Sequence, residues 1–533
     1  MIRTIPLRAL GRRALILVAA ALTAACAHHA PATAVPIPTS TVDMRTTADV
    51  MLPAPASASR GGTGGHDVRV LQQFVDSLVA LPQFGNMQWG ILLVAPERRD
   101  TLASVNADRL FLPASNMKLV TAAVALARLG PDFTWTTTFT RTGPVHRGVL
   151  HGDIVVAGTG DPSISSAMRR DPLEAFAPVV AALKAAGVMQ ITGRVRASDT
   201  PAFPGSPLGF GWDWDDLHEP YGAGITELMW NEAFTDVQVR GCGRAGRGAC
   251  ITTTPLRTSP VVHADVRVRA AGSGPPEIAW WRDSAATPGI TVRGSIAAGD
   301  SMTFSAAQPD GRATYLAAVA EAVTRAGIGV RQHATAAARV GTRDLRADTI
   351  VVLQSLPLRE VLVALQKPSQ NQIAESMFRT LALHGTGVGT PDSARAIVER
   401  QLLAWGARAD AHAIRDGSGL SRHDYLSPRL LVQVLDTMRR RSDFSVYHDA
   451  LPIAGVDGTL RNRMQQFAQG RVHAKTGTID KARAISGYVT TADGEMLLFS
   501  MIANNHTVPN REVERVQDLI IEQLVNLRRP VAP

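Results

Sequence analysis

The sequence has 533 residues, of which 45% are hydrophobic and 19% are charged. This length allows two to four domains, and the composition is typical of an ordered globular protein rather than a disordered one. The formal charge is +9, but four arginines lie within the first 13 residues, which leaves +5 for the rest of the chain. No run of like charges or basic stripe with interleaved aromatic residues follows, so nucleic acid is not expected as a partner.

The first 26 residues have the pattern of an export signal. Arginines from Arg3 to Arg13 precede an apolar run over residues 14–25, which is too short to span a bilayer. The run ends at Leu22-Thr23-Ala24-Ala25-Cys26, which resembles a lipoprotein cleavage box that would leave Cys26 lipidated. Ordinary signal cleavage beside Cys26, with soluble secretion, stays open. We expect an exported protein of the periplasm or cell envelope, whose one membrane attachment would be a lipid anchor.

Residues 27–66 are rich in Pro, Ala, Ser and Thr and read as a flexible linker. Apolar residues recur at helical spacing after Asp67, a strand is expected near residues 87–95, and a helix from Ser115 onward. Residues 141–345 differ, because short apolar runs alternate there with Gly, Pro and Asp turns. The expected strands in this region are residues 154–157, 191–195, 237–239 and 261–268.

Helical periodicity returns in the last third of the chain. The expected helices are residues 358–366, 371–383, 393–405, 428–439 and a final one around 513–524, and two strands, 485–490 and 496–502, flank a hairpin turn. We therefore expect one discontinuous catalytic domain, residues 67–140 and 346–527. Residues 141–345 would be an inserted β-rich region of one or two domains.

Cys242 and Cys250 bracket a glycine-rich loop that could bring them together. Export favours a disulfide between them, and two free thiols are the alternative. A zinc site is not expected here, because no histidine or further cysteine lies near.

Ser115 and Lys118 place a hydroxyl and an amine on one face at the start of a helix. A serine is a poor nucleophile unless a base takes its proton, and a lysine can act as that base when burial or nearby cations destabilise its ammonium form. The helix start also favours negative charge developing on a nearby oxygen. The alternative is that Ser115 caps the helix and Lys118 is a solvated first-turn residue.

Lysine is scarce in this chain. Of 55 Lys plus Arg residues only five are lysines: Lys118, Lys184, Lys367, Lys475 and Lys481. Arginine thus supplies nearly all positive charge, and lysine differs from it in being able to lose its proton. Two of the five lysines lie in short motifs, which indicates that they do chemistry.

Two further motifs follow. Ser369-Gln370-Asn371 comes after a proline at the start of an expected helix, and a helix cap at Ser369 or Asn371 is the alternative. Lys475-Thr476-Gly477-Thr478 reads as a strand in which Gly477 lets a substrate backbone approach closely, and a polar edge strand is the alternative.

The order Ser-x-x-Lys, Ser-x-Asn, Lys-Thr-Gly resembles the signature of penicillin-binding proteins and serine β-lactamases. The spacing, 254 positions from Ser115 to Ser369 and 106 from there to Lys475, is similar to that of the class C low-molecular-mass penicillin-binding proteins, the D-Ala-D-Ala carboxypeptidase/endopeptidase family S13. Further segments resemble that family across residues 67–527: Gly160-Asp161-Pro162-Ser163, Gly211-Trp212-Asp213-Trp214-Asp215-Asp216, Asp416-Gly417-Ser418-Gly419-Leu420-Ser421-Arg422 and Ser486-Gly487-Tyr488.

The resemblance implies a role for each motif residue. Ser115 would be the acylated nucleophile and Lys118 its general base, while backbone N–H groups of Ser115 and Thr478 would form the oxyanion hole. The remaining roles would be proton relay for Ser369, substrate backbone binding for Asn371, positive charge for Lys475, close approach of the substrate for Gly477, and carboxylate binding for Thr476 and Thr478. Asp416 and Arg422 would shape the site or only form a turn. Trp212 and Trp214 are expected to be buried, with contact to glycan or to a domain seam as the alternative.

The resemblance also implies the fold and the reaction. The fold would be α/β (α+β), a penicillin-binding-protein or serine β-lactamase-like transpeptidase domain with an antiparallel sheet flanked by helices and β-rich insertions. The enzyme would be a serine DD-carboxypeptidase/endopeptidase that takes peptidoglycan stem peptides and β-lactams. No metal or organic cofactor is expected, because no histidine motif with metal-ligand spacing is present in the folded part. A β-lactamase or esterase, and a non-catalytic wall-binding or β-lactam-sensing lipoprotein, are the rivals.

Overall fold

The computed structural model describes residues 64–256, 259–282, 289–331 and 348–529. The chain divides into two units, Met1–Leu52 and Pro53–Pro533, and every described residue belongs to the second. The expected leader with Cys26, and the linker as far as residue 63, lie outside the described residues. Within the described ranges, no helix combines the length and the apolar character needed to cross a membrane.

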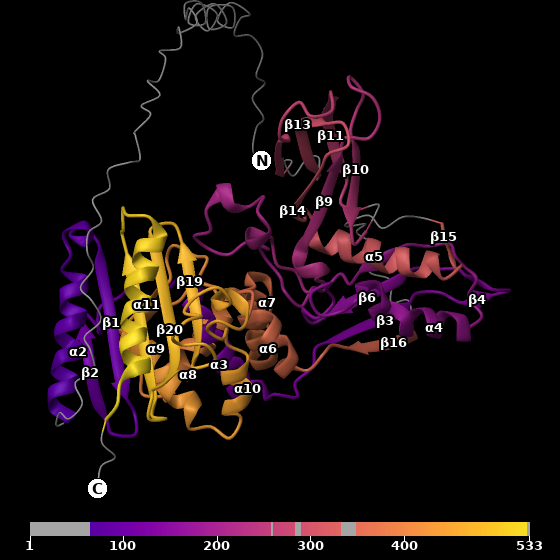
Figure 1. The fold of residues 1–533 in the computed structure, drawn as a ribbon. Coiled ribbons are helices and arrows are strands. Elements are labelled where there is room, and N and C mark those ends of the chain that lie inside the picture. Colours follow the sequence, from indigo (N-terminus) through magenta and orange to yellow (C-terminus); the bar gives the residue numbers. More distant parts are fainter. Residues whose placement is uncertain (1–63, 257–258, 283–288, 332–347, 530–533) are drawn as a thin grey trace, which may run out of the picture. The chain divides into compact units, whose positions relative to one another are not determined.

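A five-stranded antiparallel sheet joins the two ends of the described chain (Figure 1). In spatial order its strands are β19 (Val472–Ile479), β20 (Ala482–Thr490), β21 (Met496–Asn504), β1 (Gln88–Ala95) and β2 (Asp100–Val105). The expected hairpin is the β20–β21 pair, in which Thr490 lies opposite Met496. β1 pairs with β21, so the start of the described chain is part of the same sheet as its end.

Helices cover both faces of this sheet. α2 (Gly64–Val79) and α11 (Asn510–Asn526) pack against β2 and β20, while α3 (Met117–Leu129) and α9 (Pro428–Arg439) pack on the other face. Strands covered on both faces are apolar along their whole length, which is why β20 and β21 carry almost continuous buried runs. The other elements of this region are α6 (Leu358–Gln366), α7 (Asn371–Thr386), α8 (Pro391–Ala404), α10 (Phe444–Asp449), β17 (His412–Ala413) and β18 (Tyr425–Leu426).

α7 is buried along most of its length. Every residue from Asn371 to Ala382 is buried, and its apolar side chains share one core with α3, α6, α8 and α9. A fully buried large apolar side chain stabilises the fold by roughly 1.5–3 kcal/mol. The N-terminus of α7 is therefore held firmly, which matters because the Ser-Gln-Asn motif lies there.

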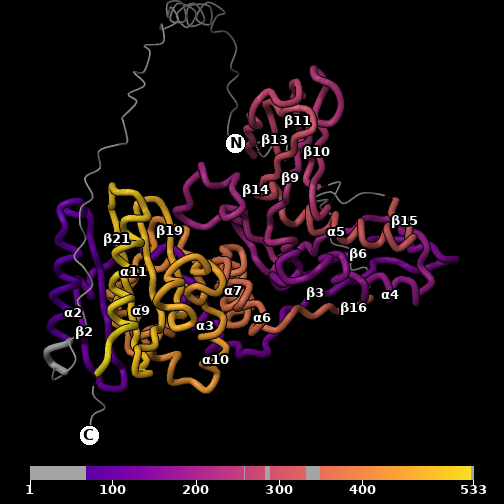
Figure 2. Tube along the Cα trace, in the orientation of Figure 1, coloured from indigo at the N-terminus to yellow at the C-terminus, as the bar shows by residue number. Residues whose placement is uncertain are grey.

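The chain leaves this region after α3 and returns to it before α6 through two adjacent strands. β3 (Thr136–Arg141) pairs with β16 (Asp348–Gln354) on one side and with β6 (Ile154–Gly158) on the other. Figure 2 lets the reader follow both passages of the chain. The expected boundary at residue 140 lies at the end of β3, and residue 346 lies outside the described residues.

The region between these passages is built from four small sheets. The first contains β16, β3, β6 and β8 (Val195–Ala197), and the second contains β15 (Gly329–Val330), β7 (Gln190–Ile191), β5 (Val149–Leu150) and β4 (Val145–His146). The third contains β10 (Cys250–Thr254), β9 (Phe234–Arg240) and β14 (Ser301–Ala307). The fourth contains β11 (Val262–Arg269), β13 (Ile290–Ala297) and β12 (Glu277–Arg282). The last two sheets share one apolar core, in which Trp280 stacks on Phe304.

Two details of this region differ from the sequence prediction. Residues 191–195 are not one strand, because β7 ends at Ile191 and β8 begins at Val195. Between them the chain passes close to the Gly152 carbonyl oxygen, which would lie 2.2 Å from a Cβ at Gly193. Sequence reasoning also missed α5 (Gly311–Arg325), and it gave no bounds for α4 (Ala177–Ala185), the helix that carries Lys184. A signal for α5 was present, since Asp310 caps it by accepting a 2.9 Å hydrogen bond from the Ala313 N–H.

Candidate active site

Ser115 lies in a short 3-10 turn, η2 (Ala114–Asn116), that leads into α3. Ala114 has a φ of +47°, in the left-handed region that non-glycine residues rarely adopt. Its carbonyl oxygen faces Gly419, where an added Cβ would lie 1.8 Å away. The turn that carries Ser115 is therefore strained and backed by a glycine of a distant loop. Ser115 is not the helix cap, because that position belongs to Asn116.

The Lys118 amine is the centre of the site. Its Nζ lies 2.7 Å from Ser115 Oγ, 2.6 Å from Asn371 Oδ1 and 2.8 Å from the Ser418 carbonyl oxygen. Lys118 is completely buried, so the alternative of a solvated surface lysine is wrong. The oxygens of Asn371 and Ser418 thus hold the amine against the Ser115 hydroxyl.

Burial sets the basicity of this amine. It lowers the pKa of Lys118 to about 7, and the negative charges of Asp416 and Glu375 oppose that shift. A lysine with this pKa is largely neutral just above neutral pH, so it has a lone pair available for the Ser115 proton.

The Ser-Gln-Asn motif links α6 to α7. Ser369 is half-buried and has a φ of +68° in the connecting turn, and Asn371 is the first residue of α7. The Asn371 amide accepts from Lys118 and donates through Nδ2 to the Tyr221 carbonyl oxygen at 3.0 Å. The helix cap is Gln370, whose side-chain oxygen accepts from the Gln372 N–H. The capping role considered for Ser369 or Asn371 is therefore wrong.

The Lys-Thr-Gly-Thr motif lies on β19, the edge strand of the main sheet. Lys475 is completely buried, and its amine donates to the Thr476 carbonyl oxygen at 2.9 Å. Burial, followed by the positive charge of Lys118, lowers the pKa of Lys475 well below its ordinary value. The charge of Lys118 thus acts on Lys475, and a plain polar edge strand does not describe β19.

β19 also lies directly against the turn that carries Ser115. The Asn116 amide donates to the Lys475 carbonyl oxygen at 3.0 Å, and a Cβ at Gly477 would lie 2.7 Å from the Pro113 carbonyl oxygen. Gly477 is therefore required for this approach. Thr478 is exposed, and the half-buried Thr476 places its hydroxyl 2.7 Å from the Thr459 hydroxyl.

The loop from Asp416 to Arg422 supplies the wall behind Lys118. Both oxygens of the buried Asp416 carboxylate accept hydrogen bonds: Oδ1 from the N–H groups of Ser418 and Gly419, Oδ2 from the N–H of Ser421 and the Trp212 indole. Asp416 therefore forms the turn, and in doing so it also shapes the site, because the turn fixes the Ser418 carbonyl group that contacts Lys118.

Glu375 is a residue of this site that sequence reasoning missed. Its Oε1 accepts from the N–H groups of Gly417 and Ser418 at 2.9 and 2.7 Å. Burial raises the pKa of Glu375 to about 8, and the charge of Asp416 adds to the shift. The available signal was its spacing, because Glu375 follows Asn371 by four positions and so shares its helix face.

The segment from residue 210 to 222 contributes contacts from the inserted region. Trp212 is half-buried and reaches Asp416, whereas Trp214 is 85% exposed. The expectation that both tryptophans are buried is wrong for Trp214. Arg422 forms an ion pair with Asp213 at 3.1 Å and donates to the Asp480 carbonyl oxygen, so it ties this segment to the end of β19.

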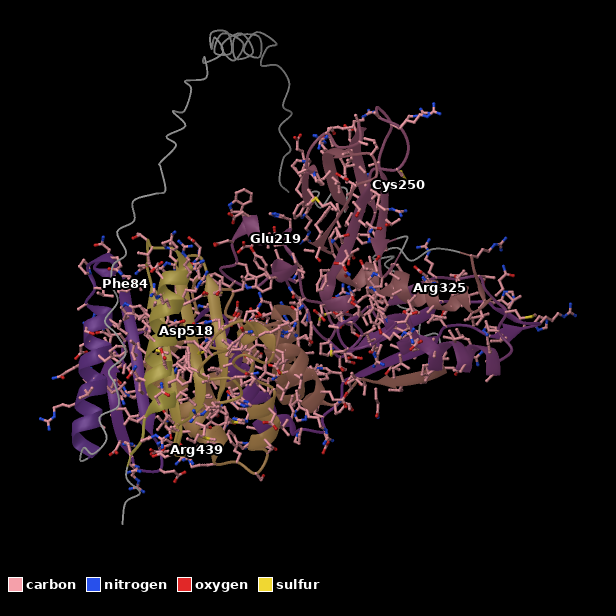
Figure 3. The ribbon with its side chains drawn as sticks, in the orientation of Figure 1. Phe84, Glu219, Cys250, Arg325, Arg439 and Asp518 are labelled. Carbon is pink, nitrogen blue, oxygen red and sulfur yellow. A yellow bond between two sulfur atoms is a disulfide. The ribbon has the colours of Figure 1, made fainter. Side chains whose placement is uncertain are left out.

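Cys242 and Cys250 are joined by a disulfide whose Cα atoms lie 5.7 Å apart. The bond links the end of β9 to the start of β10, near the label of Cys250 in Figure 3. The predicted pairing is confirmed, and the alternative of two free thiols is wrong.

The fold and the site together define a class. The site has a serine at the start of a helix, and a buried lysine of lowered pKa contacts its hydroxyl. An amide and a second buried lysine lie beside this pair. Such an arrangement can carry out acyl transfer through a serine ester. The sequence model of the D-Ala-D-Ala carboxypeptidase 3 (S13) family matches residues 71–526. The chain belongs to this family, which confirms the resemblance seen in the sequence and the serine-type D-Ala-D-Ala carboxypeptidase class.

Relatives and solved structures agree with this assignment. A D-alanyl-D-alanine carboxypeptidase of Actinomadura sp. is 30% identical over 498 residues, which are 90% of this chain and 88% of the relative. D-alanyl-D-alanine carboxypeptidase DacB of Haemophilus influenzae is 26% identical over 467 residues, 81% of this chain and 88% of the relative. The crystal structure of penicillin-binding protein 4 from Haemophilus influenzae has a TM-score of 0.72 and 24% identity, and covers 85% of this chain and 99% of its own. The predicted fold class is therefore confirmed.

Proposed function

We propose that this chain is a serine DD-carboxypeptidase and DD-endopeptidase that acts on peptidoglycan stem peptides through an acyl-enzyme on Ser115. The observation that carries the proposal is the 2.7 Å contact between Lys118 Nζ and Ser115 Oγ, made by a completely buried lysine. The family assignment supplies the substrate class. The Haemophilus penicillin-binding protein 4 has also been solved with a β-lactam bound, which supports β-lactams as ligands of this site.

Acylation would begin with proton transfer from Ser115 Oγ to Lys118 Nζ. The serine oxygen attacks the carbonyl carbon of the penultimate D-Ala, and the negative charge that develops on the carbonyl oxygen accepts hydrogen bonds from the N–H groups of Ser115 and Thr478. The C–N bond then breaks as the leaving amine takes a proton, relayed through the Ser369 hydroxyl. Water later attacks the ester, returns the proton to Ser115 and releases the shortened peptide.

Substrate binding would use the residues around this pair. Asn371 holds the substrate backbone, and β19 accepts the peptide along its open edge beside Gly477. The hydroxyls of Thr476 and Thr478 bind the terminal carboxylate. That carboxylate would favour the charged form of Lys475, whose amine is buried and has no acidic side chain among its hydrogen-bond partners.

Carboxypeptidase and endopeptidase reactions differ only in the leaving amine. A terminal D-Ala leaves in the first, and the side-chain amine of a cross-link leaves in the second, so one acyl-enzyme serves both.

We also propose that the chain is exported, that Cys26 carries the lipid anchor, and that residues 67–140 and 346–527 form the catalytic domain around the insertion of residues 141–345.

Two measurements test the function. Labelled penicillin should attach to Ser115 in a one-to-one adduct located by peptide mapping, and purified cross-linked muropeptides should lose D-Ala and be split at cross-links. A Ser115→Ala variant should do neither while keeping its melting temperature. An adduct on another residue refutes the assignment of Ser115. Rapid turnover of penicillin without muropeptide cleavage would instead identify a β-lactamase.

The pH dependence of acylation follows from the pKa of Lys118. Below a pKa of about 7 the amine carries a proton and cannot take another, so the second-order rate of acylation should rise with pH and level off above that value. Between about pH 6 and about pH 8 the rate should increase about tenfold, following the neutral fraction of one group.

A control separates Lys118 from Glu375, whose pKa also lies near this range. Glu375 has a pKa raised to about 8, so it is mostly protonated at neutral pH and a Glu375→Gln variant should retain the inflection near pH 7. A profile that is flat across this range in the wild-type protein would contradict the assigned base.

A further inference from the structure

Two histidines from separate elements meet at a place that the proposed mechanism does not use. His448 belongs to α10 and His473 to β19, and their rings stack with centroids 3.9 Å apart. The Asp449 carboxylate lies 2.8 Å from His448 Nδ1. One ligand atom from each of these three side chains lies within 4.8 Å of the others.

This set of donors suits a borderline-soft divalent cation. Two imidazole nitrogens and one carboxylate oxygen are ligands typical of Zn²⁺, with bonds of about 2.0–2.2 Å. Ligand atoms around a tetrahedral ion are then about 3.3 Å apart. An imidazole nitrogen binds an ion in the plane of its ring, so at least one of the two stacked rings must turn out of the stack when the ion binds. The Asp449 side chain is 70% exposed, which leaves it free to turn and gives an ion access from solvent.

The surroundings orient one ligand and shield the cluster on one side. His473 Nδ1 lies 3.4 Å from the His448 carbonyl oxygen, which leaves its Nε2 available for an ion. The rings of Phe444 and Tyr488 lie 5.1 and 5.4 Å from the His448 ring and form an apolar wall. The nearby Lys367 opposes a cation, but its charge is balanced by Asp457 at 2.8 Å.

We propose that His448, Asp449 and His473 bind one divalent transition-metal ion of the Zn²⁺ type, with water completing the coordination. The ion would join α10 to β19. His473 precedes Lys475 by two positions on the strand, so their side chains share a face about 6.6–6.8 Å apart. The metal site thus lies on β19, the strand that carries Lys475. Binding of metal there does not depend on the proposed peptidase activity.

The test is Zn²⁺ binding to the full chain, produced without a purification tag and freed of metal with a chelator. All proteins carry His28→Ala and His29→Ala, because the sequence has two adjacent histidines there that could bind metal. Calorimetric titration at neutral pH should give one ion per chain. His448→Gln and His473→Gln should each weaken the affinity at least about tenfold, since each removes one of three ligands.

Matched controls make the outcome decisive. His146→Ala removes an exposed histidine and should bind Zn²⁺ as the parent does. Zn²⁺ should raise the melting temperature, and Mg²⁺ at equal concentration should not. If a glutamine variant fails to fold, Asp449→Asn, at an exposed position, should still weaken binding. Absence of stoichiometric binding, or retention of the parental affinity in all three ligand variants, refutes the site and leaves only an aromatic stack.

Discussion

Replacing Lys118 by arginine is expected to lower the second-order rate of penicillin acylation at Ser115 by about 10²–10⁴-fold, the usual contribution of a general base. Arginine keeps the positive charge, but its pKa stays above about 12, so it cannot take the serine proton. The larger guanidinium must also fit where the lysine amine is completely buried between Ser115, Asn371 and Ser418.

The controls separate loss of the base from loss of the fold. Lys184→Arg, at an exposed position of α4, should acylate at the wild-type rate. Lys118→Met is neutral and of similar length, so it tests the missing base without the bulk of arginine. Circular dichroism and melting temperature report folding in each protein. A folded Lys118→Arg protein that acylates within about tenfold of the wild type would show that Lys118 is not the base.

Gly419→Ala is expected to lower the acylation rate by about 10²-fold, the typical cost of displacing a reacting group by about 1 Å. The new Cβ would lie 1.8 Å from the carbonyl oxygen of Ala114 and 3.0 Å from the Cβ of Met117. Neither neighbour can yield without moving the turn that carries Ser115. The change also reaches Lys118, because the preceding residue, Ser418, supplies one of the two oxygens that hold its amine against Ser115.

The matched control is Gly299→Ala. Both glycines have a positive φ, +80° at Gly419 and +88° at Gly299, so alanine costs about 1–2 kcal/mol of backbone strain at either position. A Cβ at Gly299 meets nothing within 4 Å, so this variant has the strain without the collision. It should acylate normally with a modestly lower melting temperature. Equal acylation rates for both alanine variants would contradict the proposed support of Ser115 by Gly419.

The sequence by itself determined the parts of this protein that depend on neighbouring residues. Helical periodicity predicted α6 and α9 with their observed bounds, because the apolar face of a helix appears in the sequence as apolar residues that recur every three or four positions. The scarcity of lysine directed attention to Lys118 and Lys475, and both are among the completely buried side chains. The order and spacing of three motifs indicated the S13 family, which the family match confirms.

Only the tertiary structure decided which of these residues touch. Glu375, Asp416 and the Ser418 carbonyl group act on Lys118 from positions hundreds of residues away in the chain, and no local pattern encodes such a contact. The same holds for the two histidines of the proposed metal site. His448 and His473 lack metal-ligand spacing in the sequence, and they meet because α10 packs beside the edge strand β19. Long-range packing, which buries Lys118 and Glu375, also sets the pKa values of these two groups, so their chemistry could not be read from the chain alone.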